Sequence, residues 1–250
     1  MFYYIFDGTF EGFLSVVYDI YASGRQPVAI TANHPEHLSL FAQEVVIVTD
    51  RKKAARVAEG IKKSLGVSAY QHVYYCVLSA QPDACLCAFA YLRFGFAEGS
   101  KNTDCRLDKK EVELTHRISN EVSMERHRLL GLVRFCQRGL ALYAAISPRH
   151  DVLELIAPHF CRRYASSVWV IHDLTREKAV FYNGRNWSIN PLPSFAVPGD
   201  ESDPFVDLWR QYFAAINIKE RRNPKQQKQY MPQSYWQHLP EKSSKPLSKT

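Results

Sequence analysis

The apolar pattern of the chain changes period near Leu129, and this change constrains the fold more than any other feature. Before it, apolar residues recur at helical spacing, as between Asp50 and Gly66, where an Asp begins and a Gly ends the segment. After it, short apolar runs are separated by turn residues such as Gln137-Arg138-Gly139. We therefore expect a mainly helical first half followed by a sheet-forming second half.

The first half begins with the strand candidate Met1 to Phe6. Thr9 is placed to cap a helix that Gly24 ends, because its hydroxyl can accept a hydrogen bond from a free first-turn amide. The remaining elements expected here are a short strand within Phe41–Thr49, the helix between Asp50 and Gly66, two helices within Ser68–Ala97 joined by a turn at Pro82, and a charged helix over Leu107–Arg126.

The second half is expected to be a sheet covered by helices. Its predicted elements are strands at Leu130–Phe135 and Leu140–Ile146, a helix over Val152–Tyr164, strands at Val168–His172 and Lys178–Tyr182, and a further short strand at Trp187–Ile189. The order strand, strand, helix, strand, strand indicates an antiparallel sheet and the α+β class. Asp203-Pro204 then starts a C-terminal helix. The expected regions are 1–126, mainly helical; 127–241, α+β with the C-terminal helix and arm; and 242–250, a disordered tail.

Positive charge is concentrated at the C-terminal end. The chain has a net charge of +7, and Lys219 to Thr250 holds eight Lys or Arg against Glu220 and Glu241. A basic segment of this kind favours polyanions such as nucleic acid, because binding releases condensed counterions. We therefore expect a basic C-terminal arm that contacts nucleic acid.

No apolar run approaches the roughly 18 residues needed to span a bilayer, and the first residues lack the basic region of a secretory signal. A cytoplasmic protein without membrane contact is the expectation.

The six cysteines are then expected to be free thiols. Cys85, Cys87 and Cys105 leave metal binding open as the alternative, but paired C-x(2–4)-C knuckles are absent, so neither a metal nor a cofactor is predicted.

Several polar residues fall on elements that should otherwise be apolar. Glu125, Arg128 and Arg134 lie where the charged helix meets the first strand, and Arg134 is placed either to grip phosphate or to pair with Glu125. His159 near a helix end is either a buried hydrogen-bond donor or a general acid–base group. Asp173 and Arg176 flank a hairpin turn, where an Asp commonly bonds its own backbone.

The arm itself combines cations and aromatic rings. Arg221, Arg222 and Asn223, together with Tyr230, suit phosphate contact and base stacking. For Tyr235 and Trp236 we favour a different role, which is to pin the arm to the body of the protein.

Several segments together resemble a known bacterial family. They are F-D-G-T-F-E-G-F-L at the start, E-R-H-R-L-L-G-L-V-R-F, P-H-F and I-H-D-L-T-R in the middle, and L-W-R-Q-Y-F, I-K-E-R-R-N and M-P-Q-S-Y-W-Q-H-L-P-E near the end. The chain is similar over Tyr4 to about Glu241 to a family named for DNA metabolism and DNA repair. The C-terminal portion of that family is a domain of unknown function that also occurs fused to uracil-DNA-glycosylase-like domains.

The resemblance implies a role in DNA repair or modification beside a radical-SAM partner enzyme. The C-x(3)-C-x(2)-C motif that ligates a radical-SAM cluster is absent here, so the partner would perform that chemistry. The polar positions that match the family are Asp7, Glu11, Glu125, Arg128, Arg134, His159, Asp173, Arg176, Arg221 and Asn223.

Three hypotheses follow. The first is an accessory protein that binds DNA and the radical-SAM partner, with Arg128, Arg134, Arg176, Arg221, Arg222 and Asn223 on the nucleic acid. The alternative is a glycosylase-like hydrolase acting on a nucleotide or damaged base, with Glu125, His159 and Asp173 as acid–base residues. The third is a structural subunit whose role is its interface with the partner.

Overall fold

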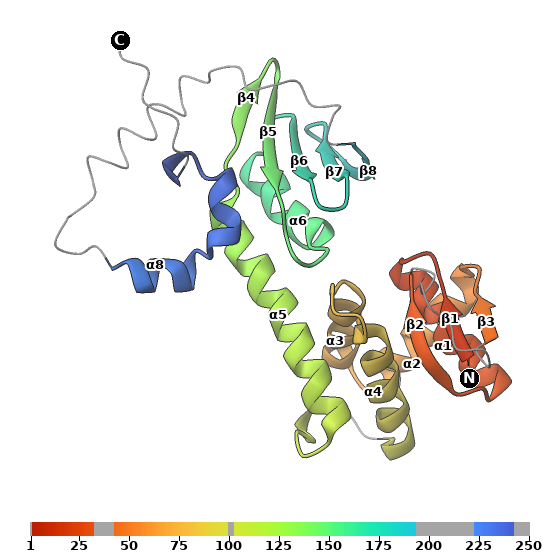
Figure 1. The fold of residues 1–250 in the computed structure, drawn as a ribbon. Helices are drawn as coiled ribbons and strands as arrows, with labels where there is room; N and C mark the ends of the chain where they lie inside the picture. The colour runs from red at the N-terminus through yellow and green to blue at the C-terminus, as the bar shows by residue number, and fades with distance from the viewer. Residues whose placement is uncertain (1, 33–42, 100–102, 194–222, 243–250) are drawn as a thin grey trace, which may run out of the picture. The chain divides into compact units, whose positions relative to one another are not determined.

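A computed structural model describes residues 2–32, 43–99, 103–193 and 223–242. The chain forms two compact units, Met1–Ser123 and Met124–Thr250. Figure 1 labels the helices and strands of both units, which are described in turn below. Within the described residues, no helix combines the length and the apolar character needed to cross a bilayer.

The first unit contains a three-stranded parallel sheet with the order β2-β1-β3. Its strands are β1 (Phe2–Ile5), β2 (Pro27–Thr31) and β3 (Gln43–Val46). The strands at the start of the chain and within 41–49 were predicted, but β2 and the pairing of the three strands were not. The N-terminal region is mainly helical, as expected, but it also contains a parallel sheet that was not predicted. A short strand such as β2 has little sequence pattern of its own and depends on its neighbours.

Helices account for the rest of the first unit. They are α1 (Phe10–Ser23), α2 (Arg51–Ser64), α3 (Val67–Val77), α4 (Ala84–Glu98), the short 3-10 helix η1 (Thr103–Cys105) and the first part of α5 (Lys110–Leu132). The expected caps are present: Thr9 Oγ1 accepts from Gly12 N at 3.0 Å, and Asp50 Oδ1 accepts from Lys52 N at 2.8 Å. Gly24 ends α1 in the left-handed conformation with φ 70°. The two helices joined by a turn at Pro82 are confirmed as α3 and α4.

The second unit contains a five-stranded sheet with the order β4-β5-β6-β7-β8. Its elements are β4 (Cys136–Arg138), β5 (Ala141–Ile146), α6 (Leu153–Arg163), β6 (Trp169–Asp173), β7 (Lys178–Tyr182) and β8 (Trp187–Pro191), followed by α8 (Pro224–Tyr230), η4 (Gln233–His238) and η5 (Pro240–Lys242). Two predicted segments lie outside the described residues: the helix expected to start at Asp203-Pro204, and the tail 243–250.

Two predictions for this sheet were wrong. The sheet is mixed, because β5 and β6 pair in parallel while the other neighbours are antiparallel. The reason is that α6 forms the crossover between β5 and β6, and a crossover returns the chain in the same direction. The expected strand Leu130–Phe135 is also absent, since α5 continues to Leu132 and β4 begins at Cys136. A short apolar run does not distinguish a helix end from a strand.

The core of the second unit lies between α6 and the sheet. Ile156 and Phe160 of α6 are buried, as are Trp169 and Ile171 of β6 and Val180 of β7. Trp169 stacks on Tyr182 with ring centroids 5.2 Å apart, and the Tyr182 hydroxyl donates to Ala165 O at 3.2 Å. This packing fixes α6 on the sheet and so sets the position of the charged side chains on its outer face.

Candidate nucleic-acid interface and a clamped loop

Glu125 is a buried carboxylate that accepts three hydrogen bonds from described residues of the second unit. It lies on α5 with 4% of its surface exposed. Its Oε1 accepts from Arg149 N at 2.9 Å and from the Tyr235 hydroxyl at 2.6 Å, and its Oε2 accepts from His150 N at 2.7 Å. Glu125 therefore holds the main chain after β5 and ties η4 to it.

Asp173 and Arg176 also hold the loop that follows β5. Asp173, at the end of β6, is fully buried, and its Oδ2 accepts from Arg176 Nη1 at 3.0 Å. The Arg176 guanidinium also donates to Pro148 O at 3.2 Å and to Arg149 O at 2.5 Å. Burial raises the pKa of Asp173, and the charge and hydrogen bond of Arg176 oppose that rise. The pair links the β6–β7 turn to the loop after β5.

The segment 147–151 is thus held at each position, and we refer to it as the clamped loop. Besides the bonds to Glu125 and Arg176, His238 Nε2 lies 2.9 Å from Ser147 Oγ, and Lys178 Nζ pairs with Asp151. Of its five residues, only Arg149 is exposed. The expected pinning of the C-terminal segment by Tyr235 is seen here, and Trp236 Nε1 donates to Met231 O at 2.9 Å within that segment.

No hydrogen bond links the three acid–base candidates, all of which are described residues. Glu125 and Asp173 are both committed to the clamped loop and its partners, whereas His159 lies on α6 and shares no hydrogen bond with either. Acid–base chemistry at Glu125 would require it to give up buried hydrogen bonds, which are costly to leave unmade. The enzyme hypothesis stays a prediction.

His159 belongs instead to a group of cations, which we call the α6 cationic cluster: Arg126, His159, Arg162 and Arg163. Arg162 and Arg163 are exposed in the last turn of α6. Arg126 reaches the same helix, because its Nε donates to Leu155 O at 3.4 Å. Burial lowers the pKa of His159, and the positive charges of Arg163, Arg162 and Arg126 lower it further. Among the described residues, His159 Nε2 has no hydrogen-bond partner.

The other residues predicted to contact nucleic acid lie in different parts of the second unit or outside the described residues. Arg134 lies between α5 and β4, not on a strand, and its Nη1 donates to Gly131 O at 2.7 Å near the helix end. Arg128 lies on α5 near the Tyr235 hydroxyl. Burial raises the pKa of Tyr235, and the positive charge of Arg128 opposes that rise. Asn223 caps α8 by accepting from Gln226 N at 3.1 Å. Arg221 and Arg222 lie outside the described residues.

Arg126, Arg162 and Arg163 were not among the predicted contact residues. A signal for two of them was present in the sequence. His159, Arg162 and Arg163 follow at i, i+3 and i+4, the spacing that places side chains on one face of a helix. Arg126 joins them only through tertiary packing, which the sequence does not display.

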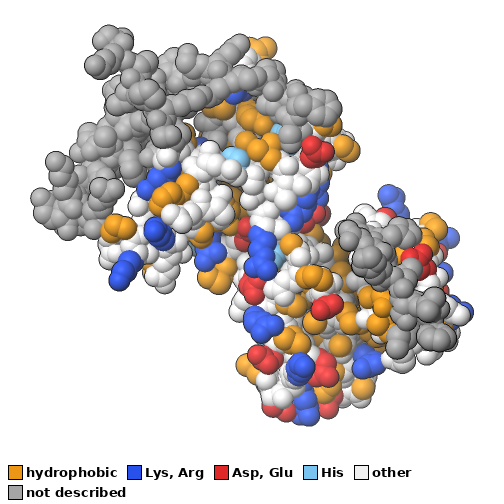
Figure 2. All heavy atoms as spheres, in the orientation of Figure 1, with side chains coloured by type: hydrophobic (Ala, Val, Ile, Leu, Met, Phe, Trp, Pro, Cys, Tyr) orange, Lys and Arg blue, Asp and Glu red, His pale blue; other side chains and the backbone are white. Residues whose placement is uncertain are grey.

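The positive charge of the chain belongs to the second unit. Residues 124–250 hold 19 Lys or Arg against 11 Asp or Glu, a net charge of +8, whereas residues 1–123 hold 13 against 14. Lys225 and Lys228 are exposed on α8, where Figure 2 shows basic side chains at the surface. The net positive charge of the chain therefore lies in the second unit.

Asp7 and Glu11 line a separate cavity in the first unit. It has a volume of about 570 Å³ and lies where β1 and β3 end and α1 and α2 begin, with Thr49, Arg51 and Tyr70 also in its wall. Asp7 Oδ2 accepts from Thr49 Oγ1 at 2.7 Å, which joins the two strand ends. Ligands of parallel sheets bind at this kind of edge.

The cysteines singled out in the sequence do not gather with other metal-binding side chains in the described part of the chain. Among those residues, one group of His, Cys, Asp or Glu side chains has metal-ligand spacing, and it contains His72, Asp104 and His116 but no cysteine. Cys85 and Cys105 are free thiols; Cys105 is exposed, and burial raises the pKa of Cys85 to about 12.

Fold and surface together define an α+β protein whose C-terminal unit is strongly basic. The family model DUF4130, a domain of unknown function, matches residues 82–241, and the chain belongs to this family. The match includes α4, η1, α5 and the described elements of the second unit from β4 to η4, and it ends within η5. No curated protein matches the chain.

Proposed function

We propose that the protein is a nucleic-acid-binding accessory factor in DNA repair or modification that acts beside a radical-SAM partner enzyme. The observation that carries the binding role is the charge asymmetry of the two units, with a net charge of +8 in residues 124–250. The repair context and the partner come from the resemblance of the sequence to a DNA-metabolism family.

Within the second unit, the α6 cationic cluster is the proposed phosphate contact. Arg162 and Arg163 are exposed on neighbouring positions of a helix that the sheet holds in place. Guanidinium groups bind phosphate oxygens through two parallel hydrogen bonds, so two adjacent arginines can engage successive phosphates. Such contacts position the protein without reading sequence, which suits an accessory role.

The basic C-terminal segment supports the same proposal. Lys225 and Lys228 are exposed on α8, and the exposed Tyr230 offers a ring on which a base can stack. Arg221 and Arg222 precede this helix in the sequence. The first unit, which carries no excess of positive charge, is assigned to the partner enzyme.

The test measures binding of a labelled DNA duplex and of a single strand by fluorescence anisotropy over a series of salt concentrations. We expect the double variant Arg162→Ala/Arg163→Ala to bind about tenfold more weakly or worse. The slope of log Kd against log salt should fall by about 2, because each lost phosphate contact removes nearly one released counterion. Arg221→Ala should lower the slope by about 1.

Lys52→Ala/Lys63→Ala is the matched control, since both lysines are exposed on α2 in the first unit and the same charge is removed. Equal loss in the control and the arginine variant would show only a general charge effect and reject the cluster. Absence of DNA binding at low salt would reject the function. Co-purification with a radical-SAM enzyme from the same cells tests the partner separately.

A further inference from the structure

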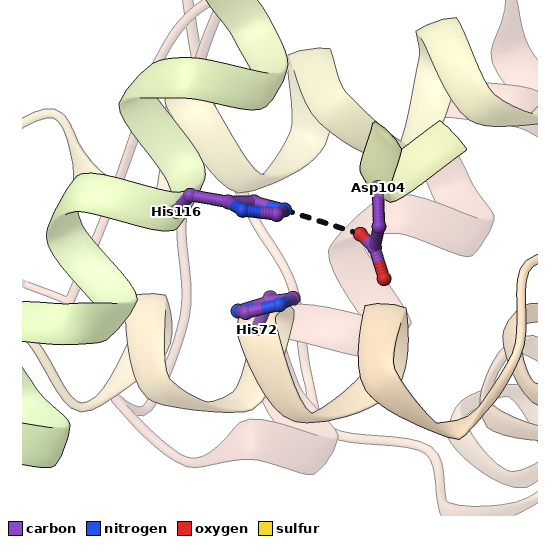
Figure 3. A group of neighbouring side chains, drawn as sticks. All are labelled: His72, Asp104 and His116. Carbon is purple, nitrogen blue, oxygen red and sulfur yellow. Dashed lines mark hydrogen bonds and ion pairs between the residues drawn. The ribbon is translucent and has the colours of Figure 1, made fainter. Parts of the chain in front are cut away.

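Three potential metal ligands converge in the first unit from three separate elements. His72 comes from α3, Asp104 from η1 and His116 from α5. The candidate donor atoms all lie within 4.8 Å of one another. Figure 3 shows the three side chains pointing toward a common space, with the His116 ring above the His72 ring and the Asp104 carboxylate beside both.

We propose that His72, Asp104 and His116 bind one divalent first-row transition-metal ion, such as Zn²⁺, with the remaining coordination positions open to water or a substrate. Two imidazoles and one carboxylate are a common donor set for Zn²⁺ and Fe²⁺ in sites that retain an open position.

The spacing of the donors suits such an ion. His116 Nε2 lies 3.2 Å from Asp104 Oδ1. Metal–nitrogen and metal–oxygen bonds near 2.1 Å in a tetrahedral site separate neighbouring donors by about 3.4 Å. The observed distance between these two donor atoms is therefore close to that of one edge of a coordination polyhedron. The candidate donor atom of His72 lies within 4.8 Å of the other two, so His72 completes the set when its ring turns toward the ion.

Surrounding hydrogen bonds orient the three ligands. His72 Nδ1 lies 2.9 Å from Ser119 Oγ, and when the ring donates this bond its Nε2 carries the lone pair that a metal requires. The buried Tyr91 donates its hydroxyl to Asp104 Oδ1 at 2.5 Å, and Ser68 also bonds the carboxylate. Outer hydrogen bonds of this kind fix ligand geometry in metal sites.

Burial and hydrogen bonding favour the metal-binding forms of His72 and Asp104. The two imidazole rings stack with centroids 4.2 Å apart. Burial, followed by the nearby His116, lowers the pKa of His72, so this ring is neutral near pH 7. Burial by itself would raise the pKa of Asp104, but hydrogen bonds from Tyr91, Ser68 and His116 bring it below its ordinary value. The carboxylate is thus ionised, as a ligand must be.

The decisive experiment uses the full-length, untagged protein after removal of metals with a chelator. Equilibrium dialysis against Zn²⁺ should give one ion per chain, and Co²⁺ should give visible d–d absorption that Zn²⁺ abolishes. We expect His72→Ala, His116→Ala and Asp104→Asn each to weaken binding at least tenfold. Ser119→Ala should weaken it about ten- to hundredfold, as loss of an outer hydrogen bond does in known sites.

His127→Ala is the matched control, because His127 is an exposed histidine on the same helix, α5. Its binding should equal that of the wild type. Circular dichroism identifies any variant that fails to fold, and Asp104→Asn keeps the shape of the side chain if an alanine variant does. The proposal is overturned if the wild type binds less than one ion, if the ligand variants bind as well as His127→Ala, or if only Cys105→Ser abolishes binding.

Discussion

Replacing Glu125 with Gln should destabilise the second unit by about 3 kcal/mol. The best orientation of the Gln side chain keeps its oxygen at the Oε1 position, where it can accept from Arg149 N and from the Tyr235 hydroxyl. Its NH₂ group then faces His150 N, which donates to Oε2 in the wild type. One buried donor left unpaired costs about 1–3 kcal/mol, and loss of the charge weakens the other two bonds.

The tryptophans provide a selective measurement. All four, Trp169, Trp187, Trp209 and Trp236, lie within residues 124–250. Urea unfolding followed by tryptophan fluorescence therefore reports the second unit, while far-UV circular dichroism reports both. We expect the fluorescence transition of Glu125→Gln to move to lower urea with little change in its slope.

Two further variants complete this test. Tyr235→Phe removes one hydrogen bond to the same carboxylate and should cost about 1.5 kcal/mol. In the double variant the two losses should not add, because the residues share that bond. Glu154→Gln, at an exposed position of α6, should change stability by less than about 0.5 kcal/mol. If Glu125→Gln is as stable as Glu154→Gln, the buried carboxylate does not hold the loop.

Two other predictions concern the first unit and the DNA contact. Gly12→Ala should lower the thermal stability measured by circular dichroism, by about 1–3 kcal/mol, because the added Cβ would lie 2.2 Å from Asp7 Oδ1 and 2.9 Å from Thr49 Oγ1. Gly60→Ala in α2, where the Cβ meets nothing within 4 Å, should be neutral or stabilising, and an equal loss in both would refute the steric argument. DNA affinity should rise as pH falls below 6.5, the ordinary pKa of a histidine. Burial and the three arginines lower the pKa of His159 in the free protein, and a bound phosphate should raise it in the complex. Binding then takes up a proton, so lower pH favours it. Anisotropy titrations at several pH values should show this slope in the wild type and a smaller one in His159→Gln.

The helix caps were predictable because they depend on neighbours in the sequence. Thr9 and Asp50 bond amides two or three residues further on, so their roles are visible in a short segment. The parallel pairings of β1 with β2 and of β5 with β6 are not local in this sense. They depend on which strands become neighbours after the intervening helices pack, and short apolar runs do not specify this.

The candidate site was likewise predictable only in part. Glu125 and Asp173 stood out as charges on apolar elements, and both are buried. Their hydrogen-bond partners could not be predicted, because Glu125 accepts from main-chain amides of the clamped loop and from a tyrosine 110 residues away. His72, Asp104 and His116 went unnoticed for the same reason. Their spacing matches no metal motif, and only the packing of α3, η1 and α5 brings them together.

The clamped loop has a consequence for how the surface can change during evolution. Glu125 and Arg176 bind amide and carbonyl groups of residues 148–150 rather than their side chains. Every amino acid except proline offers the same groups at position 149, so the path of the backbone there does not depend on the residue present. Selection can alter the exposed side chain at 149 while positions 125 and 176 stay fixed, which separates the evolution of the surface chemistry from that of the fold.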